Sequence, residues 1–271
     1  MTHALTIAGS DSGGGAGIQA DLKTFAAFGV FGTSAITAIT AQNTLGVTAS
    51  LPLPTEIITK QIEAIVSDIG VQAAKTGMLA TTSIVETVAA ALQSFDILKV
   101  VVDPVMIAKS GAPLLGKEAL VAVRTKILPC AHVVTPNIME AEILSERSIR
   151  SMEDVKDAAL RIHELGPTAV LIKGGHLTGQ DAIDVLYDGQ SFTELKSVRL
   201  DSQNTHGTGC TLSAAIAASL AKGHTLVSAC HLAKSYVTEA IRNGFSIGQG
   251  YGALHHLWAS GTFPDSIKPL S

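Results

Sequence analysis

Residues 204–210, NTHGTGC, place two glycines and a cysteine at the expected start of a helix. Glycines just before a helix expose several backbone N–H groups, and the helix dipole adds positive potential there. Such a site suits a polyphosphate or the charge of phosphoryl transfer. Cys210 lies in the first turn, where the pKa of a thiol tends to fall, so it could accept a proton from a substrate hydroxyl. A small buried side chain is an equally good interpretation of this cysteine.

Further polar residues follow buried, strand-like runs. Asn137 and Glu140 could hold Mg²⁺ through waters, although a helix cap with an exposed glutamate is the favoured interpretation. Lys173 ends the run AVLIK and could contact a phosphate, and Asp103 ends KVVVD and could orient magnesium or a phosphate. Either could equally be an ordinary charge at a strand end. His206 lacks metal-ligand spacing to other ligands, so we expect a structural role for it.

A glycine-rich stretch at residues 12–17 follows the first predicted strand. Residues 15–20, GAGIQA, match the dinucleotide-binding pattern G-x-G-x-x-A. That pattern also requires an acidic residue further along the chain to hold a ribose, and no Asp or Glu occurs between Asp21 and Glu56. A nicotinamide-dependent oxidoreductase is therefore a disfavoured alternative. The glycines could instead bring the backbone close to a small ligand, or form an ordinary strand-to-helix turn.

Other motif matches and the composition exclude further classes. Gly116-Lys117 is followed by Glu118 rather than Ser or Thr, so the chain has no Walker A sequence. The GFSIG match at 244–248 lacks the strand-turn-helix context of a nucleophile elbow. A net charge of −4 and 4% aromatic residues disfavour a nucleic-acid binder. The three cysteines form no C-x-x-C pair, and the apolar runs are too short to cross a bilayer, so we expect a cytoplasmic protein.

The residues above need elements that bring them together, and the apolar runs form a repeated β-α-β pattern. Strands are predicted at 5–8, 33–42, 72–76, 99–103, 132–135 and 169–173, a hairpin at 182–200, and helices at 16–28, 55–69, 83–95, 117–128, 138–145, 151–165, 211–222 and 226–243. Ser83 with Glu86 predicts a capping box. The pattern predicts an α/β fold with a doubly wound, mostly parallel sheet in one domain over residues 1–271. Ligands of such sheets bind at the carboxyl ends of the strands, where the polar residues fall.

Seven motifs in fixed order cover essentially the whole chain: AGSDSGGGAGIQADLKTF, TAITAQNT, KTGML, VVDPVM, TPNxxEAE, LIKGGH and NTHGTGCTLSAAIAA. Together they resemble the hydroxymethylpyrimidine/phosphomethylpyrimidine kinases of thiamine biosynthesis, in the ribokinase-like superfamily. Most of that superfamily has aspartate in a GTGD motif, whereas Cys210 stands there in this sequence, as in the pyrimidine-kinase branch. The resemblance implies a homodimer that uses ATP and Mg²⁺ to phosphorylate 4-amino-5-hydroxymethyl-2-methylpyrimidine, and then the monophosphate.

The resemblance also implies roles at the pyrimidine end of the site. Gln42 pairs its amide with the aminopyrimidine edge, and Asp21 bonds the pyrimidine amino group or a ring nitrogen. The residues that shape the pocket around the ring are Gly9, Met78 and Val105.

At the phosphoryl-transfer end, the resemblance places Cys210 beside the hydroxymethyl oxygen. The backbone N–H groups of Gly207, Thr208, Gly209 and Cys210 stabilise the transferring phosphoryl group. ATP phosphates and Mg²⁺ are handled by Asp103, Asn137, Glu140 and Lys173, and the residues nearer the nucleotide are Thr205 and Lys234. A neutral cysteine, unlike an aspartate, would not repel the anionic acceptor of the second phosphorylation.

Two alternatives stay open beside the oxidoreductase. Relatives with the same GTGC motif phosphorylate pyridoxal or pyridoxine, although Gln42 and Met78 favour a pyrimidine. A non-catalytic binding protein on the same fold is disfavoured by the intact Cys210, Lys173 and Glu140. Residues 107–115 are a candidate lid over the site.

Overall fold

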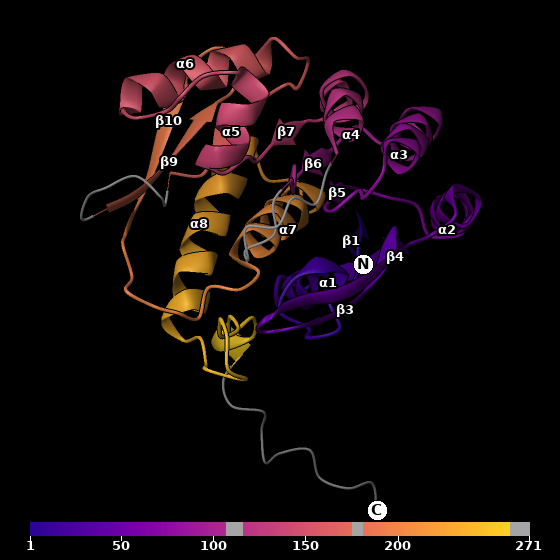
Figure 1. The fold of residues 1–271 in the computed structure, drawn as a ribbon, viewed down its shortest axis with the longest axis horizontal. Helices are drawn as coiled ribbons and strands as arrows, with labels where there is room; N and C mark the ends of the chain where they lie inside the picture. Colours follow the sequence, from indigo (N-terminus) through magenta and orange to yellow (C-terminus); the bar gives the residue numbers. More distant parts are fainter. Residues whose placement is uncertain (107–115, 175–180, 261–271) are drawn as a thin grey trace, which may run out of the picture.

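An eight-stranded sheet crosses the molecule in the order β10-β9-β8-β7-β6-β5-β1-β2 (Figure 1). The computed structural model describes residues 1–106, 116–174 and 181–260, so the candidate lid at 107–115 lies outside the described residues. The strands are β1 (His3–Ala8), β2 (Phe31–Ile36), β5 (Ala74–Thr76), β6 (Val100–Val102), β7 (Val133–Val134), β8 (Val170–Ile172), β9 (Asp181–Tyr187) and β10 (Phe192–Val198). The six strands β8, β7, β6, β5, β1 and β2 are parallel to one another. Strand β9 is antiparallel to both its neighbours, β8 and β10. The predicted fold class is confirmed.

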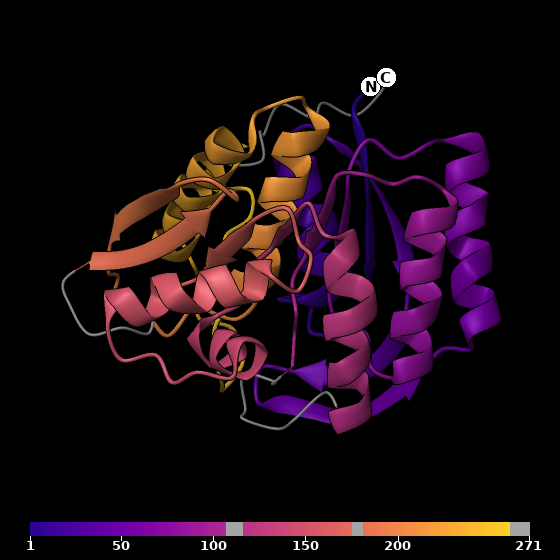
Figure 2. The same ribbon diagram turned by 90° about the horizontal axis from the view of Figure 1, so that it is seen from above.

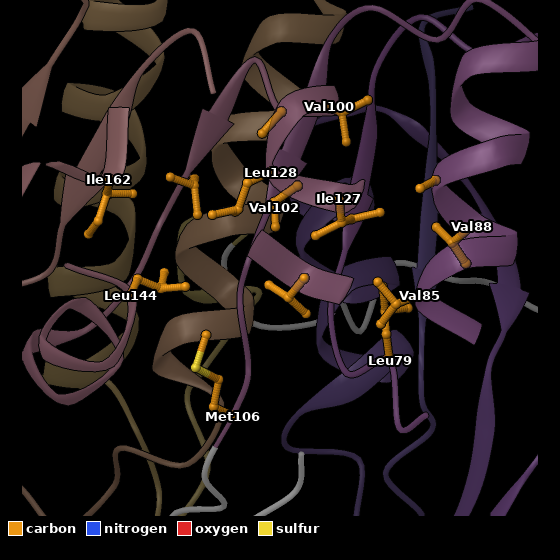
Figure 3. Packing of buried hydrophobic residues seen from close by; sticks show 14 of the residues in the cluster. Leu79, Val85, Val88, Val100, Val102, Met106, Ile127, Leu128, Leu144 and Ile162 are labelled. Atoms are coloured by element: carbon orange, nitrogen blue, oxygen red, sulfur yellow. The ribbon is translucent and has the colours of Figure 1, made fainter. Parts of the chain in front are cut away.

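Helices cover both faces of the sheet (Figures 1 and 2). One face carries α1 (Gly17–Ala27), α7 (Thr208–Ala221) and α8 (Leu226–Arg242), and the other carries α2 (Thr55–Asp68), α3 (Thr82–Ser94), α4 (Lys117–Ala122), α5 (Ile138–Ser145) and α6 (Met152–His163). The side chains of each strand alternate between the two faces. Val100 and Val102 therefore pack in the cluster shown in Figure 3, whereas Val101 packs against the helices of the opposite face.

Helix α7 is buried along most of its length, from Thr211 to Ala221. Its residues are mainly alanine, serine and other small side chains, which let it pack closely against α1, α8 and the sheet. Burial of this helix places its N-terminus firmly at one end of the sheet.

The strand order reverses at β1, which has β2 on one side and β5 on the other. Ligands of doubly wound sheets bind at such a switch point, outside the carboxyl ends of the strands. A separate two-stranded sheet, β3 (Ala38–Asn43) and β4 (Gly46–Pro52), lies at this end of the main sheet (Figure 2).

The boundaries differ from the sequence prediction at two strands. The single strand predicted at 33–42 is wrong: β2 ends at Ile36, β3 begins at Ala38, and they belong to different sheets. Buried Thr37 makes this break, because its N–H donates to Ala8 O and its carbonyl accepts from Leu53 N. Strand β4 escaped prediction because nearly all its residues are exposed, which leaves no apolar alternation.

Three helix boundaries also differ. Helix α3 is capped by Thr81, whose side chain accepts from Ile84 N, so the capping box predicted at Ser83 is wrong. The helix predicted at 117–128 is divided into α4, a π-helical turn (Val123–Ile127) and a 3₁₀ turn (Leu128–Cys130). Helix α7 begins at Thr208, three residues before its predicted start, which moves the glycine motif into the helix.

Candidate active site

A cavity of about 820 Å³ opens at the carboxyl ends of β1 and β5 to β8. Its volume is within the range of ligand sites, which hold about 300–1,000 Å³. The candidate residues that line it are Gly9, Gln42, Met78, Asp103, Val105, Asn137, Glu140, Lys173, Thr205, Gly207, Thr208, Gly209, Cys210 and Lys234. Residues more than 200 positions apart in sequence therefore meet in one cavity, and Asp21 is the candidate that does not line it.

The N-terminus of α7 lines this cavity, and the turn that precedes the helix requires a glycine at its cap. Gly207 caps the helix with φ +82°, and a Cβ at this position would lie 1.8 Å from Gly15 O. The first N–H groups of a helix have no acceptor within the helix, so they are available to an anion. Thr208 closes the turn by donating from Oγ1 to Thr205 O at 2.8 Å.

A lysine–aspartate pair lies directly beneath this helix start. Lys173 Nζ is 2.9 Å from Asp103 Oδ1, and a Cβ on Gly209 would be 3.3 Å from the same Nζ. Although burial by itself raises the pKa of Asp103, the ammonium groups of Lys173 and Lys75 hold it below its ordinary value. Both members of the pair therefore stay ionised, and the ammonium group of Lys173 lies below the helix N-terminus.

Asn137 and Glu140 form the capping box of α5 while also lining the cavity. Asn137 Oδ1 accepts from Glu140 N at 2.9 Å, and Glu140 Oε2 accepts from Asn137 N at 2.8 Å. The expected cap is confirmed, but the expectation of an exposed glutamate is wrong, because Glu140 is 3% exposed. Burial raises its pKa to about 7, against the opposing effect of Lys173. Capping and a site role are therefore compatible for this residue.

The half-buried thiol of Cys210 is not acidified by its position on the helix. Burial raises its pKa to about 11, and this effect outweighs the lowering by Lys75 and by the Gly17 N–H. The expectation of a lowered thiol pKa is wrong, because desolvation of the thiolate exceeds the favourable potential of the first turn. Cys210 is a neutral thiol at pH 7.

An ion pair that the sequence motifs did not reveal lies next to the cavity, and its Lys75 is one of the lining residues. Lys75 Nζ contacts both oxygens of Asp21 at 2.9 and 3.0 Å, and Thr6 Oγ1 donates to Asp21 Oδ2 at 2.6 Å. Both charged side chains are 0% exposed. Burial by itself lowers the pKa of Lys75, but the Asp21 carboxylate raises it above its ordinary value. This corrects the expected role of Asp21, whose carboxylate is occupied by Lys75 rather than turned to a ligand.

A second pair joins the glycine-rich loop to the segment before α7. His206 Nε2 lies 2.8 Å from Asp11 Oδ2, across 195 positions of sequence. The sequence predicts a structural role for His206, and it marks Asp11 only as a polar residue that follows the first strand. The signal available for Asp11 was its place directly after the first strand, at the carboxyl edge of the sheet.

The remaining wall of the cavity is built around β1 and β3. Gly9 makes room for a methionine, since a Cβ there would lie 2.5 Å from Met78 Cε. Gln42 follows an irregularity in β3, and its Oε1 accepts from Thr40 Oγ1 at 3.2 Å. Val105 also lines the cavity, so this wall combines apolar side chains with one carboxamide.

At the far side, Lys234 of α8 is held by Asp184 of β9 at 2.8 Å. Asp184 also accepts from Gly174 N at 3.0 Å, directly after Lys173. Lys234 and Thr205 line the cavity together with Lys173.

The described residues contain no group of three or more His, Cys, Asp or Glu side chains that could hold a metal by themselves. Mg²⁺ in nucleotide sites usually takes one or two carboxylates, with phosphates and waters as its other ligands. Glu140 and Asp103, whose charges influence one another at the cavity wall, fit that smaller requirement. Within the described part of the chain, no helix is both long and apolar enough to cross a membrane.

Comparison with known proteins agrees with this architecture. The family model described as phosphomethylpyrimidine kinase matches residues 11–255. The hydroxymethylpyrimidine/phosphomethylpyrimidine kinase of Streptomyces coelicolor is 51% identical, over 95% of each chain. The crystal structure of phosphomethylpyrimidine kinase from Clostridium difficile 630 superposes with a TM-score of 0.80 at 46% identity, covering 89% of this chain and 100% of that one. Pyridoxal kinase from Staphylococcus aureus, in complex with AMP-PCP and pyridoxal, gives 0.89 at 38% identity, covering 97% and 96%. The sheet order, the cavity at its carboxyl edge and these matches together show that the chain belongs to the phosphomethylpyrimidine kinase family.

Proposed function

We propose that this protein transfers a phosphoryl group from ATP to 4-amino-5-hydroxymethyl-2-methylpyrimidine and then to the resulting monophosphate, as a step in the biosynthesis of thiamine diphosphate. One observation carries the proposal: a single cavity joins the α7 N-terminus and Lys173 to a wall that carries Gln42 and Met78. The first part suits phosphates, and the second suits a flat heterocycle with a polar edge. Curated relatives named hydroxymethylpyrimidine/phosphomethylpyrimidine kinase support the same assignment.

The transfer itself requires positioning and charge neutralisation rather than a strong base. The N–H groups of Gly207, Thr208 and Gly209 and the ammonium group of Lys173 stabilise the charge on the transferring phosphoryl group. Cys210 lies beside the acceptor oxygen as a neutral thiol, because its pKa of about 11 keeps it protonated. A neutral group at this position does not repel the phosphate of the second acceptor.

Mg²⁺ supplies further neutralisation of the nucleotide phosphates when it is bound. Glu140 and Asp103 would hold it, partly through water. Asn137 keeps Glu140 in place through the capping box. At the nucleotide end, Thr205 and Lys234 contact ATP.

At the acceptor end, the Gln42 carboxamide faces the aminopyrimidine edge, since an amide both donates and accepts. Gly9, Met78 and Val105 surround the ring. We further propose one kinase domain over residues 1–271 and a homodimer. Exposed apolar residues of β3 and β4, Ile39 at 44% and Leu51 at 64%, support an interface at the small sheet.

Pyridoxal kinase is the second candidate, because pyridoxal kinases superpose on this chain with TM-scores of 0.88–0.90. Both substrates are six-membered nitrogen heterocycles that bear a hydroxymethyl group. Gln42 favours the pyrimidine, since its carboxamide matches an amino group beside a ring nitrogen.

The test is ADP release with Mg-ATP and hydroxymethylpyrimidine, its monophosphate or pyridoxal in parallel. We expect turnover of both pyrimidines and slow turnover of pyridoxal. Lys173→Met should abolish the activity, whereas Lys60→Met, an exposed lysine on α2, should not change it. Turnover of pyridoxal alone would assign the protein to vitamin B6 salvage.

A further inference from the structure

We propose that Asp11 and His206 form a positioning pair that docks the glycine-rich loop, residues 13–17, against the N-terminus of α7, and that this docking sets the rate of phosphoryl transfer. The proposal rests on the proposed function for its kinetic consequence. Its geometric basis is independent of the identity of the substrate.

Asp11 organises the loop through four hydrogen bonds to one carboxylate. Oδ1 accepts from Gly13 N at 2.8 Å, and Oδ2 accepts from Gly15 N at 3.1 Å and from Ala16 N at 2.8 Å. The fourth donor is His206 Nε2, at 2.8 Å from Oδ2. Asp11 is 1% exposed, so water does not replace these donors.

The bond to His206 has a defined direction. Burial by itself raises the pKa of Asp11, but His206 and the loop N–H groups hold it below its ordinary value. The carboxylate is therefore ionised and can only accept, so His206 Nε2 carries the proton.

His206 is itself fixed by its backbone and by contact with the loop. Its N–H donates to Gly252 O at 3.1 Å, and a Cβ on Gly15 would lie 2.3 Å from its Cδ2. The next residue is Gly207, the cap of α7, which packs against Gly15 O. Two glycines thus allow the imidazole and the helix cap to press directly on the loop backbone.

The loop in turn reaches the reaction centre. Its last residue is Gly17, whose backbone N–H lowers the pKa of the Cys210 thiol against the larger effect of burial. Gly17 has φ +57°, and a Cβ there would lie 2.5 Å from Gly9 O. Displacement of the loop would therefore move a neighbour of Cys210 and the packing of the Gly207 cap at once. Small misplacements of a reacting group can cost about 100-fold in rate.

Three histidine variants test the pair. His206→Gln can place Nε2 near the imidazole position and donate to Asp11, whereas the amide of His206→Asn is too short to do so. His224→Gln is the matched control, because His224 is exposed beyond the opposite end of α7. The readouts are kcat and KM for both pyrimidines, thermal stability, and hydrogen exchange followed by mass spectrometry.

We expect H206N to lower kcat about 10- to 100-fold for both acceptors with little change in KM. Exchange should increase at residues 11–17 and 207–210 and not elsewhere, while H206Q and H224Q resemble the wild type. A wild-type kcat for H206N, failure of Gln to rescue, or uniformly faster exchange would overturn the proposal. If the wild-type protein phosphorylates neither pyrimidine, the proposed function fails. Hydrogen exchange in H206N still tests the docking in that case, because an increase confined to residues 11–17 and 207–210 supports it and a uniform increase contradicts it.

Discussion

Replacement of Asp21 by Asn should destabilise the protein without weakening pyrimidine binding. Asp21 and Lys75 are both 0% exposed, and the carboxylate accepts twice from Lys75 and once from Thr6. Asparagine keeps the size but removes the charge, which leaves the ammonium of Lys75 buried and unpaired. Breaking a buried pair in this way costs about 3–5 kcal/mol. At about 2–4 °C per kcal/mol for a chain of this size, the melting temperature should fall by about 6–20 °C.

The assay is thermal or urea unfolding, with KM for the pyrimidine measured on the same samples at a temperature where each is folded. Asp68→Asn is the matched control, since Asp68 is exposed on α2 and its change should stay within about 0.5 kcal/mol. A double-mutant cycle with D21V, K75M and D21V/K75M completes the test. The double variant should recover most of the loss, because apolar replacement of a buried pair is often neutral.

Two results would refute this reasoning. Unchanged stability of D21N would show that the pair contributes little and that Lys75 finds other partners. A large rise in KM for the pyrimidine at unchanged stability would show that Asp21 contacts the substrate after all.

Three further predictions address the site. Cys210→Asp should reduce the second phosphorylation about 10-fold or more relative to the first, because an ionised carboxylate repels the anionic acceptor; equal kcat/KM losses for the two acceptors would contradict this. Glu140 keeps its proton up to about pH 7 in the folded state but only to 4.5 when unfolded, so stability should fall as pH rises between these values, and Glu140→Gln should flatten that slope in melts in metal-free buffer. Gly207→Ala should abolish turnover, because the added Cβ would collide with Gly15 O. Gly223→Ala is the control, since Gly223 has a similar φ of +89° but no neighbour within 4 Å, and the change should lower the free energy of unfolding by only about 1 kcal/mol. Similar effects of the two changes in activity and unfolding assays would show that close packing at Gly207 is unimportant.

Much of this protein can be read from the order of its residues. Apolar runs of strand length alternate with helical patterns, and polar residues such as Asp103 and Lys173 follow the strands. Parallel strands bring their carboxyl ends to one edge, so this local pattern is sufficient to predict a common site. The same is true of the anion site at α7, because glycines before a helix and the helix dipole are local properties.

Tertiary structure decided which side chains actually face the cavity and in which charge state. Asp21 and Lys75 are 54 positions apart, and only the pairing of β1 with β5 beside α1 brings them together next to the cavity. Asp11 meets His206 in the same non-local way. The pKa of Cys210 depends on how much solvent the surrounding elements exclude, which no motif records. Sequence therefore determined the edge of the sheet where chemistry occurs, and packing determined which residues are available for it, because burial and long-range pairing are properties of the assembled fold.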